Sequence, residues 1–512
     1  MYGRAVGVSL LGIGGRPVTV EAFVGRGLPS FVVTGLPGAA VNDARERIRP
    51  AVEHAKLEWP LRRVIVNLAP ANVRKEGPGL DLPIAVAVLA AMGQVPRDPP
   101  TRYAFAGELS LRGELVATPG VLSVAIAAAR AGLDGVVVPS ANAVEAAQVD
   151  DLRVVAAMNL TEVVGFLKGT WSPPDVESIP PARAPGAQLD DLFEVRGQTH
   201  ARRALEVAAA GGHNLLMVGS PGAGKTMLAR RLPTILPELT RAESLEASQL
   251  HSVAGLLTGE GLLRTRPFRA PHHSVSVAGL LGGGSTYLRP GEVSLAHHGL
   301  LFLDELTEFH RDALEGLRQP LEDGRVVVTR ALGSVEFPAR FTLVAAAKPC
   351  PCGFRGDERT MCRCADHRVQ VYRQKLSGPL LDRIDLRLRI PRLTKRELLG
   401  SGAGEGSAAV RGRVAVARER QLRRYGRMGV VCNAHLPGPL ARRSAKLDTG
   451  AERLLERAVE GLGLSGRGFD RALKVARTVA DLEGSELVGE THLSEALSYR
   501  DGFEPLELAR VG

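Results

Sequence analysis

A glycine-rich loop between a buried strand and a helix constrains the fold of this chain more than any other feature. The loop reads Gly219-Ser220-Pro221-Gly222-Ala223-Gly224-Lys225-Thr226, and it follows a continuous apolar run from Asn214 to Val218. In the spacing G-x-x-x-x-G-K-[ST], backbone N–H groups close around phosphate at a helix N-terminus. Apolar runs at 300–303 and 341–346 are typical of further buried parallel strands. The sequence therefore predicts an α/β core with a parallel sheet.

The side chains of this loop predict a site for ATP and Mg²⁺. Lys225 would neutralise β- and γ-phosphate oxygens, and Thr226 would offer its hydroxyl to Mg²⁺. Asp304 ends the run 300–303 and would hold Mg²⁺ through water, while Glu305 would polarise the attacking water as base. The alternative is that the two acids only end a strand at a helix cap. The glycine-rich loop before them in the sequence makes this alternative less favoured.

Two seams divide the 512 residues, a length that suits about three domains. Residues 171–188 are rich in Pro and residues 400–409 are rich in Gly and Ser, as in linkers. We expect a first domain at 1–170, a linker at 171–188, an ATPase core at 189–399 and a helical lid domain at 400–512. In the first domain, short β-type runs alternate with helical ones, which indicates an α/β or α+β fold.

Composition argues against a membrane-spanning or exported protein. The longest apolar stretch, from Leu82 to Met92, is far shorter than the roughly 20 residues that a spanning helix needs. The N-terminus shows no signal-peptide pattern, and five cysteines are too few for a disulfide scaffold. We therefore expect a soluble, cytoplasmic protein without membrane contacts.

The charge is positive overall and uneven along the chain. Lys and Arg number 65 against 55 Asp and Glu, and seven arginines but one acid, Glu419, lie between Arg411 and Arg427. Such a patch is able to meet nucleic-acid phosphates, although a solvated helix face is the commoner meaning of a charge run.

Further motifs extend along most of the chain. They are Pro267-Phe268-Arg269-Ala270-Pro271-His272-His273, Gly282-Gly283-Gly284-Ser285, Arg289-Pro290-Gly291-Glu292 and Leu317-Arg318-Gln319-Pro320-Leu321-Glu322. Together with the loop and the strand before Asp304, they resemble the Mg-chelatase-like AAA+ ATPases of the ComM/YifB family. The resemblance implies an N-terminal Lon-protease-like (S5-like) domain, an AAA+ core, a helical lid and a homo-oligomeric ring, expected to be a hexamer. It also implies a DNA motor for branch migration in recombination and natural transformation.

The resemblance assigns roles to two arginines. Arg383, in Ser377-Gly378-Pro379-Leu380-Leu381-Asp382-Arg383-Ile384-Asp385, corresponds to an arginine finger that reaches the γ-phosphate of the adjacent subunit. The alternative for Arg383 is an ion pair with Asp382 or Asp385. Arg467, at the start of the last-but-one helix, corresponds to the lid arginine that touches phosphate in cis, and Arg471 is the second choice.

Lys348 departs from the family pattern, in which the strand ends in Asn at this place. An ammonium group cannot accept a hydrogen bond from water, as the oxygen of an Asn amide does. Either hydrolysis is slow in this chain, or Lys348 acts as an electrostatic substitute near the γ-phosphate.

Four cysteines lie within fifteen residues. Cys350, Cys352, Cys362 and Cys364 supply the thiolates of a structural Zn²⁺ site, and His367 is able to replace one of them. The single residue within each pair is tight for one metal, so ordinary reduced thiols remain the alternative.

The Lon resemblance does not bring proteolysis with it. The Lon serine follows a Gly-Pro pair, whereas Gly79 follows Gly77-Pro78 here, and Leu122 stands near the place of the activating lysine. Covalent catalysis therefore has no nucleophile and no base. The remaining alternative to a DNA motor is a chelatase-type AAA+ ATPase that remodels another protein and has no DNA role. We expect His272, His273, His297 and His298 to pack in loops rather than to bind metal.

Overall fold

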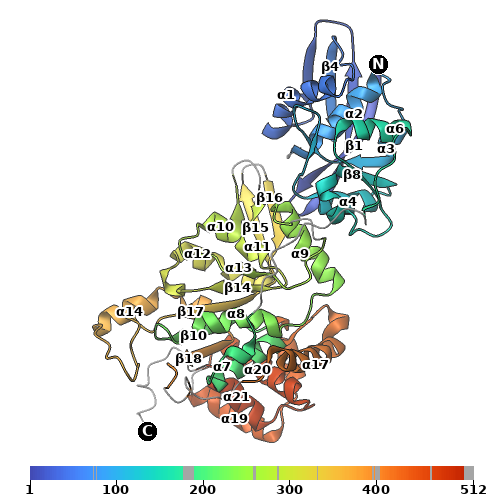
Figure 1. Ribbon diagram of the computed structural model, residues 1–512. Helices are drawn as coiled ribbons and strands as arrows, with labels where there is room; N and C mark the ends of the chain where they lie inside the picture. The colour runs from blue at the N-terminus through green and yellow to red at the C-terminus, as the bar shows by residue number, and fades with distance from the viewer. Residues whose placement is uncertain are drawn as a thin grey trace.

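The computed structural model describes residues 1–72, 74–75, 78–176, 190–257, 261–284, 288–330, 333–394, 397, 404–461 and 464–500. The chain runs from an N-terminal α/β region through a central α/β region to a helical C-terminal region (Figure 1). Residues 177–188 of the predicted linker and 400–403 of the second seam lie outside the described residues. None of the described helices is both long and apolar enough to cross a membrane.

The N-terminal region is built on a mixed seven-stranded sheet with the order β3-β4-β2-β1-β5-β8-β9. β1 and β2 form a long antiparallel hairpin, and β5, β8 and β9 continue from β1 in parallel. The strands are β1 (Tyr2–Leu11), β2 (Gly14–Val24), β3 (Ser30–Thr34), β4 (Arg63–Ala69), β5 (Tyr103–Phe105), β8 (Gly135–Pro139) and β9 (Arg153–Ala157), with a small pair β6 (Glu108–Leu109) and β7 (Leu115–Val116).

Helices pack on this sheet. They are α1 (Ala39–His54), α2 (Asp81–Ala91), α3 (Pro99–Arg102), α4 (Val121–Arg130), α5 (Ala143–Ala146) and α6 (Leu160–Lys168). In α1, α4 and α6 the buried apolar residues recur at helical spacing and form one face. α2 is buried along its whole length, which explains why its sequence is almost continuously apolar.

The central region contains a parallel five-stranded sheet with the order β11-β14-β17-β10-β18. Its strands are β10 (Leu215–Gly219), β11 (Phe268–Arg269), β14 (Leu300–Leu303), β17 (Thr342–Ala347) and β18 (Leu386–Ile390). The helices are α7 (Thr199–Gly211), α8 (Lys225–Ile235), α9 (Arg241–Val253), α10 (Val277–Leu281), α11 (Glu292–Leu295), α12 (Arg311–Gly316), α13 (Arg318–Asp323), α14 (Asp366–Gln374) and α15 (Gly378–Leu381). The three predicted strands lie side by side in this sheet, so their carboxyl ends meet at one edge.

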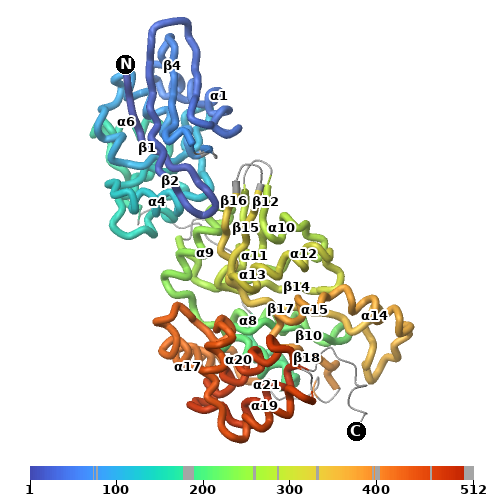
Figure 2. Tube along the Cα trace, turned by 180° about the vertical axis from the view of Figure 1, so that it is seen from behind, coloured from blue at the N-terminus to red at the C-terminus, as the bar shows by residue number. Residues whose placement is uncertain are grey.

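Two β-hairpins project from the central region toward the N-terminal region, as both views show (Figures 1 and 2). One pairs β12 (Gly282–Gly283) with β13 (Arg289–Pro290), and the other pairs β15 (Arg325–Arg330) with β16 (Gly333–Pro338). Ile13, in the turn between β1 and β2, packs into the core cluster to which Val335 and Phe337 of β16 belong.

A second contact between these two regions joins α4 to the end of α9. The backbone N–H of Gly120 donates to the carbonyl oxygen of Ser252 over 3.0 Å. The buried carboxylate of Glu145 accepts from the Ser252 hydroxyl and, at 2.8 Å, from the Leu122 N–H. The N-terminal region is thus held to the central region by polar and apolar contacts.

The C-terminal region is helical, with α17 (Ser407–Tyr425), α18 (Gly438–Ala445), α19 (Thr449–Gly461), α20 (Gly466–Glu483) and α21 (Glu490–Ser498). Apolar faces of α17 and α20 share a hydrophobic cluster with α7, α8 and β10 of the central region. The predicted fold class, with α/β regions, a parallel core sheet and a helical C-terminal region, is confirmed.

Candidate functional site

The glycine-rich loop joins β10 to α8 at the carboxyl edge of the central sheet. Gly222 and Gly224 adopt positive φ angles of 77° and 88°, which residues with a Cβ rarely tolerate. The Lys225 ammonium donates to the carbonyl oxygens of Gly219 (2.8 Å) and Ser220 (3.0 Å). Burial lowers the pKa of Lys225 from its ordinary value. The loop lines a cavity of about 470 Å³, together with Asp304, Glu305 and Lys348.

Asp304 and Glu305 follow β14 and face the loop. The Thr226 hydroxyl donates to Asp304 Oδ2 over 2.7 Å, which brings together two oxygens of the kind that Mg²⁺ prefers. Glu305 has a φ of 52°, in the left-handed region that favours glycine, and its N–H donates to Asp304 Oδ1 over 2.9 Å. Backbone strain of this kind costs about 1 kcal/mol and is often found at functional sites.

Lys348, at the end of β17, contacts the same acidic pair. Its ammonium donates to Glu305 Oε1 over 2.6 Å. This hydrogen bond lowers the pKa of Glu305, and His273 and Lys225 lower it further through their charges. The Glu305 carboxylate is therefore ionised at neutral pH, as a proton acceptor must be, but the Lys348 ammonium occupies one of its oxygens.

Arg383 and Arg467 line a different cavity. This cavity, of about 500 Å³, lies between the central and C-terminal regions, and its basic lining includes Arg340, Arg383, Arg467, Arg471 and Lys474. It shares no lining residue with the cavity of the glycine-rich loop. Arg467 thus lines the cavity that Arg383 lines and not the cavity of the glycine-rich loop, and its contact with phosphate stays a prediction.

Arg383 forms its ion pair with Glu322, not with Asp382 or Asp385 as the alternative interpretation assumed. Its side chain also donates to the Pro379 carbonyl oxygen over 2.8 Å. Asp385 is instead paired with Arg471 at 3.2 Å and hydrogen-bonded to the Asn214 N–H at 3.0 Å. Burial alone would raise the pKa of Asp385, but Arg471 and His213 hold it well below its usual range. Arg471 is thus committed to a structural ion pair, whereas Arg467 is exposed.

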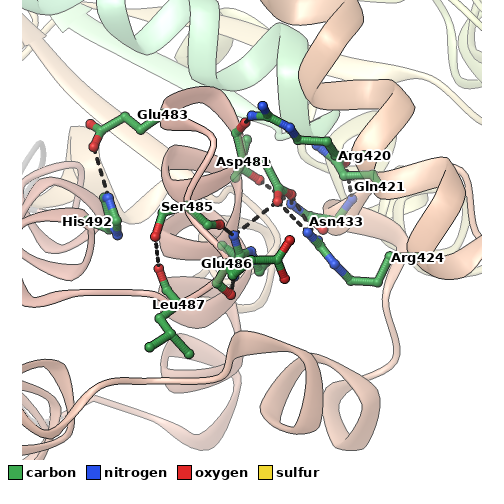
Figure 3. A network of polar contacts seen from close by, with 12 residues as sticks. Arg420, Gln421, Arg424, Asn433, Asp481, Glu483, Ser485, Glu486, Leu487 and His492 are labelled. Atoms are coloured by element: carbon green, nitrogen blue, oxygen red, sulfur yellow. Dashed lines mark hydrogen bonds and ion pairs between the residues drawn. The ribbon is translucent and has the colours of Figure 1, made fainter.

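The arginine-rich stretch expected to meet nucleic acid lies on α17 and the turn after it, and most of its arginines contact the protein itself. Arg424 pairs with the buried carboxylate of Asp481 at 2.6 Å, and Arg420 donates to the Asp481 carbonyl oxygen at 2.5 Å (Figure 3). The others with partners are Arg413 (Glu206 and Glu405), Arg418 (Ala209 carbonyl oxygen) and Arg423 (Glu419). Five of the seven arginines therefore have partners within the protein, and two of them, Arg413 and Arg418, join α17 to the central region. Arg423 remains exposed beside Glu419.

The four cysteines of the predicted zinc site converge in the segment between β17 and α14. All four sulfur atoms lie within 4.8 Å of one another. His367, the proposed replacement ligand, is not part of this group.

A second cluster joins Glu246, His297 and His298, whose ligand atoms lie within 4.8 Å. His297 Nδ1 accepts the Arg340 N–H over 2.9 Å, so the proton of the neutral ring is on Nε2, which faces Glu246. In this tautomer Nε2 of His297 has no free lone pair for a metal. His298 Nε2 also lies 2.8 Å from Glu246 Oε2, and that both histidines pack in the loop without metal stays a prediction. The rings of His272 and His273 lie against each other, tilted by 36°, with 4.0 Å between their centroids.

The positions that correspond to the Lon dyad carry no reactive pair. Gly79 lies in the 3₁₀ turn Pro78–Leu80, and Leu122 is fully buried at the start of α4. Lys75 is buried nearby in sequence, but its ammonium donates to the carbonyl oxygens of Gly35 and Pro70.

Sequence analysis missed three residues that contact the loop. Gln198, before α7, donates to the Ala223 carbonyl oxygen over 2.6 Å, and its own oxygen is buried without a partner among the described residues. Arg392 donates to the Pro221 carbonyl oxygen at 3.3 Å, and Asp357 accepts from the Ser220 side chain. Arg392 and Asp357 lie more than 130 positions from the loop, and no local pattern marks them.

Comparisons with known proteins place the whole chain among related sequences. Three family models match: "Magnesium chelatase, subunit ChlI" over residues 191–398, "Subunit ChlI of Mg-chelatase" over 20–142 and "Magnesium chelatase, subunit ChlI C-terminal" over 404–500. The chain is 43% identical over 505 residues to the competence protein ComM of Haemophilus influenzae, which covers 98% of this chain and 97% of ComM. It is 42% identical over 494 residues to YifB of Escherichia coli, covering 96% and 95%.

A shorter match concerns the Lon resemblance. The chain is 30% identical over 148 residues to the Lon protease of Treponema pallidum, a match that covers 27% of this chain and 17% of that protease.

Proposed function

Because the chain belongs to the ComM/YifB family of Mg-chelatase-like AAA+ ATPases, we propose that it hydrolyses ATP at the junctions of a homo-oligomeric ring and uses this energy to move DNA. One observation carries the proposal. The phosphate-binding cavity and the cavity lined by Arg383 and Arg467 are separate in one chain, and each has what the other lacks. A ring of identical subunits brings two unlike surfaces together at every junction.

The cavity of the glycine-rich loop would bind the nucleotide. Backbone N–H groups of residues 219–226 close around the β-phosphate, and Lys225 exchanges its present carbonyl partners for phosphate oxygens. Thr226 and Asp304 would hold Mg²⁺, which neutralises charge on the triphosphate. Glu305 accepts the proton of the attacking water.

The arginine-lined cavity would complete this site in the neighbouring subunit. Arg383 leaves Glu322 and reaches the γ-phosphate, where its planar guanidinium stabilises the charge of the transition state. Arg467 would also contact the phosphates of the neighbouring subunit, in trans rather than in cis, since it lines the same cavity as Arg383. Arg471 is already paired with Asp385, so we assign it a structural role: this ion pair positions the lid on the central region.

Lys348 serves as the electrostatic substitute for the family asparagine. Its hydrogen bond to Glu305 keeps the carboxylate ionised before ATP arrives. When ATP binds, the Lys348 ammonium would exchange its partner Glu305 for a γ-phosphate oxygen. The Glu305 carboxylate would then be free to orient water, but only while the triphosphate is bound.

DNA as the substrate is supported by the ComM likeness and by the net charge of +10. The two hairpins β12–β13 and β15–β16 lie side by side at one end of the central region (Figure 2), and the exposed Arg289 lies on β13. We propose that these hairpins line the channel of a hexameric ring and contact DNA phosphates. The protein would act in the cytoplasm, and its Lon-like region would be a scaffold without peptidase activity.

One observation favours a second candidate function. Because most arginines around α17 are paired internally, the largest basic stretch of the sequence does not support DNA binding. A chelatase-type ATPase that remodels a protein partner needs the same ATP site and no DNA contact.

An ATPase assay with and without DNA separates the two. We expect the assembled protein to hydrolyse ATP, and to do so several-fold faster with branched DNA than without it. The Lys225→Ala variant is the matched control, because it removes phosphate binding and should hydrolyse no ATP in either condition. Turnover that ignores single-stranded, double-stranded and branched DNA at low salt would favour protein remodelling.

A further inference from the structure

The four clustered cysteines have the geometry of a metal site. The sulfur atoms of Cys350 and Cys352 lie 3.4 Å apart, those of Cys350 and Cys362 lie 3.7 Å apart, and those of Cys352 and Cys362 lie 3.6 Å apart. Four sulfurs placed about 2.3 Å from one tetrahedral Zn²⁺ lie about 3.8 Å from one another. A disulfide would require about 2.05 Å, so no pair is bonded.

The surroundings of the sulfurs suit a group of negative charge. The backbone N–H groups of Phe354 and Arg363 donate to the sulfur of Cys352. The guanidinium groups of Arg355 and Arg373 lie close enough to Cys350 to interact with its charge. A zinc ion with four thiolates carries a net charge of about −2, which donors and cations of this kind stabilise.

The cysteine segment packs directly on the phosphate-binding loop. Gly353, between the two cysteine pairs, has a φ of 84°, and a Cβ on it would lie 2.7 Å from Cδ of Pro221. Asp357, further along the segment, accepts from the Ser220 side chain and pairs with Arg392 at 3.3 Å. Arg392 in turn donates to the Pro221 carbonyl oxygen.

The same segment begins two residues after Lys348 and ends two residues before α14. Tyr372 of α14 accepts a hydrogen bond from the Thr307 hydroxyl, just beyond the acidic pair. The segment therefore contacts the phosphate-binding loop, while the helix that follows it contacts Thr307, two residues after Glu305. No cysteine lines the cavity of the loop.

We propose that Cys350, Cys352, Cys362 and Cys364 bind one Zn²⁺, and that the folded zinc segment holds Ser220 and Pro221 in the position that binds phosphate. Metal binding here organises a segment that has no helix or strand of its own between Lys348 and α14. The first half of the proposal is independent of the ATP site, and the second half rests on the proposed function.

Zinc content tests the first half. The full-length protein, purified under reducing conditions, is expected to hold about one zinc per chain by mass spectrometry of the metal. The double variant Cys362→Ser/Cys364→Ser should hold none. Cys432→Ser is the matched control, because this buried fifth cysteine lies outside the cluster, and it should keep the zinc. Equal zinc in the wild-type and double-variant proteins, or none in the wild type after supply of ZnSO₄, would overturn the site.

Nucleotide affinity tests the second half without hydrolysis. Removal of zinc from the wild-type protein with a chelator should weaken binding of a fluorescent ADP about 10-fold, and ZnSO₄ should restore it. Gly353→Ala should keep its zinc and also bind ADP more weakly, because the added Cβ displaces Pro221. If the zinc-free protein binds ADP as the loaded protein does, the zinc segment does not hold the loop. If no form binds nucleotide, the proposed ATP site fails while the zinc result stands.

Discussion

The cavity of the glycine-rich loop and the arginine-lined cavity are similar in volume but differ in the side chains that line them. The first, of about 470 Å³, is lined by the glycine-rich loop, Asp304 and Glu305, and no arginine lines it among the described residues. The second, of about 500 Å³, has Arg383 and Arg467 but no phosphate loop. Under the proposed function, one chain folds the two halves of a hydrolytic site without joining them, and assembly of the ring would then be a requirement for catalysis.

Arg383→Ala should distinguish the roles of the two cavities most clearly. We expect turnover in assembled rings to fall about 10³-fold, because a guanidinium that stabilises phosphoryl transfer contributes that much or more. ATP affinity should change little, since the proposed role of Arg383 is to stabilise charge that develops only in the transition state and the cradle for the β-phosphate belongs to the other chain. Steady-state turnover and equilibrium binding measure the two effects, and Glu322→Gln, which removes only the resting partner, is the control. A large loss of affinity would contradict the separation.

Glu305→Gln should stop hydrolysis from the other cavity. Loss of the carboxylate base is expected to lower turnover about 10²- to 10³-fold while ATP binding is kept. Single-turnover hydrolysis with radiolabelled ATP checks this result. Unchanged turnover would mean that another group accepts the proton.

Arg471→Ala should destabilise the fold rather than slow the chemistry directly. It leaves the buried Asp385 without its closest cation, so we expect the free energy of unfolding to fall by about 3 kcal/mol. Chemical denaturation measures this change. The exposed Arg467→Ala is the matched control in the same cavity, and it should lower turnover without loss of stability. The reverse pattern would exchange the two roles.

Lys348→Met should have the smallest effect, on the pH dependence of kcat/KM, which reports the ionisation of the enzyme before ATP binds. In that state the ammonium lowers the pKa of Glu305, so kcat/KM is lost only when the pH falls through that lowered pKa. Without the ammonium the pKa rises toward its ordinary value, and the acid limb of kcat/KM should move to higher pH. Lys348→Arg keeps the charge and should leave the limb in place. A limb that does not move in the Met variant would contradict the coupling.

The sequence predicted local features well and long-range pairings poorly. The strand before Gly219 and the strand before Asp304 are short apolar runs, and both lie in the predicted parallel sheet. The side of the lid that Arg467 faces depends on how α20 packs on the central region, which no residue spacing encodes. Likewise, the arginines after Arg411 read as a charge run, because partners such as Glu206 and Asp481 are distant in sequence. The sequence placed Lys348 and Glu305 near the same γ-phosphate, but it did not predict the hydrogen bond between them.

Mixing two inactive variants tests the joined-cavity account most directly. Glu305→Gln chains keep Arg383, and Arg383→Ala chains keep Glu305, so about one quarter of the junctions in an equal mixture would be intact. We predict that the mixture hydrolyses ATP clearly faster than either variant alone, with a maximum at equal amounts. Rings shown by affinity tags to contain both chains, yet no more active than the average of the two separate variants, would contradict the account.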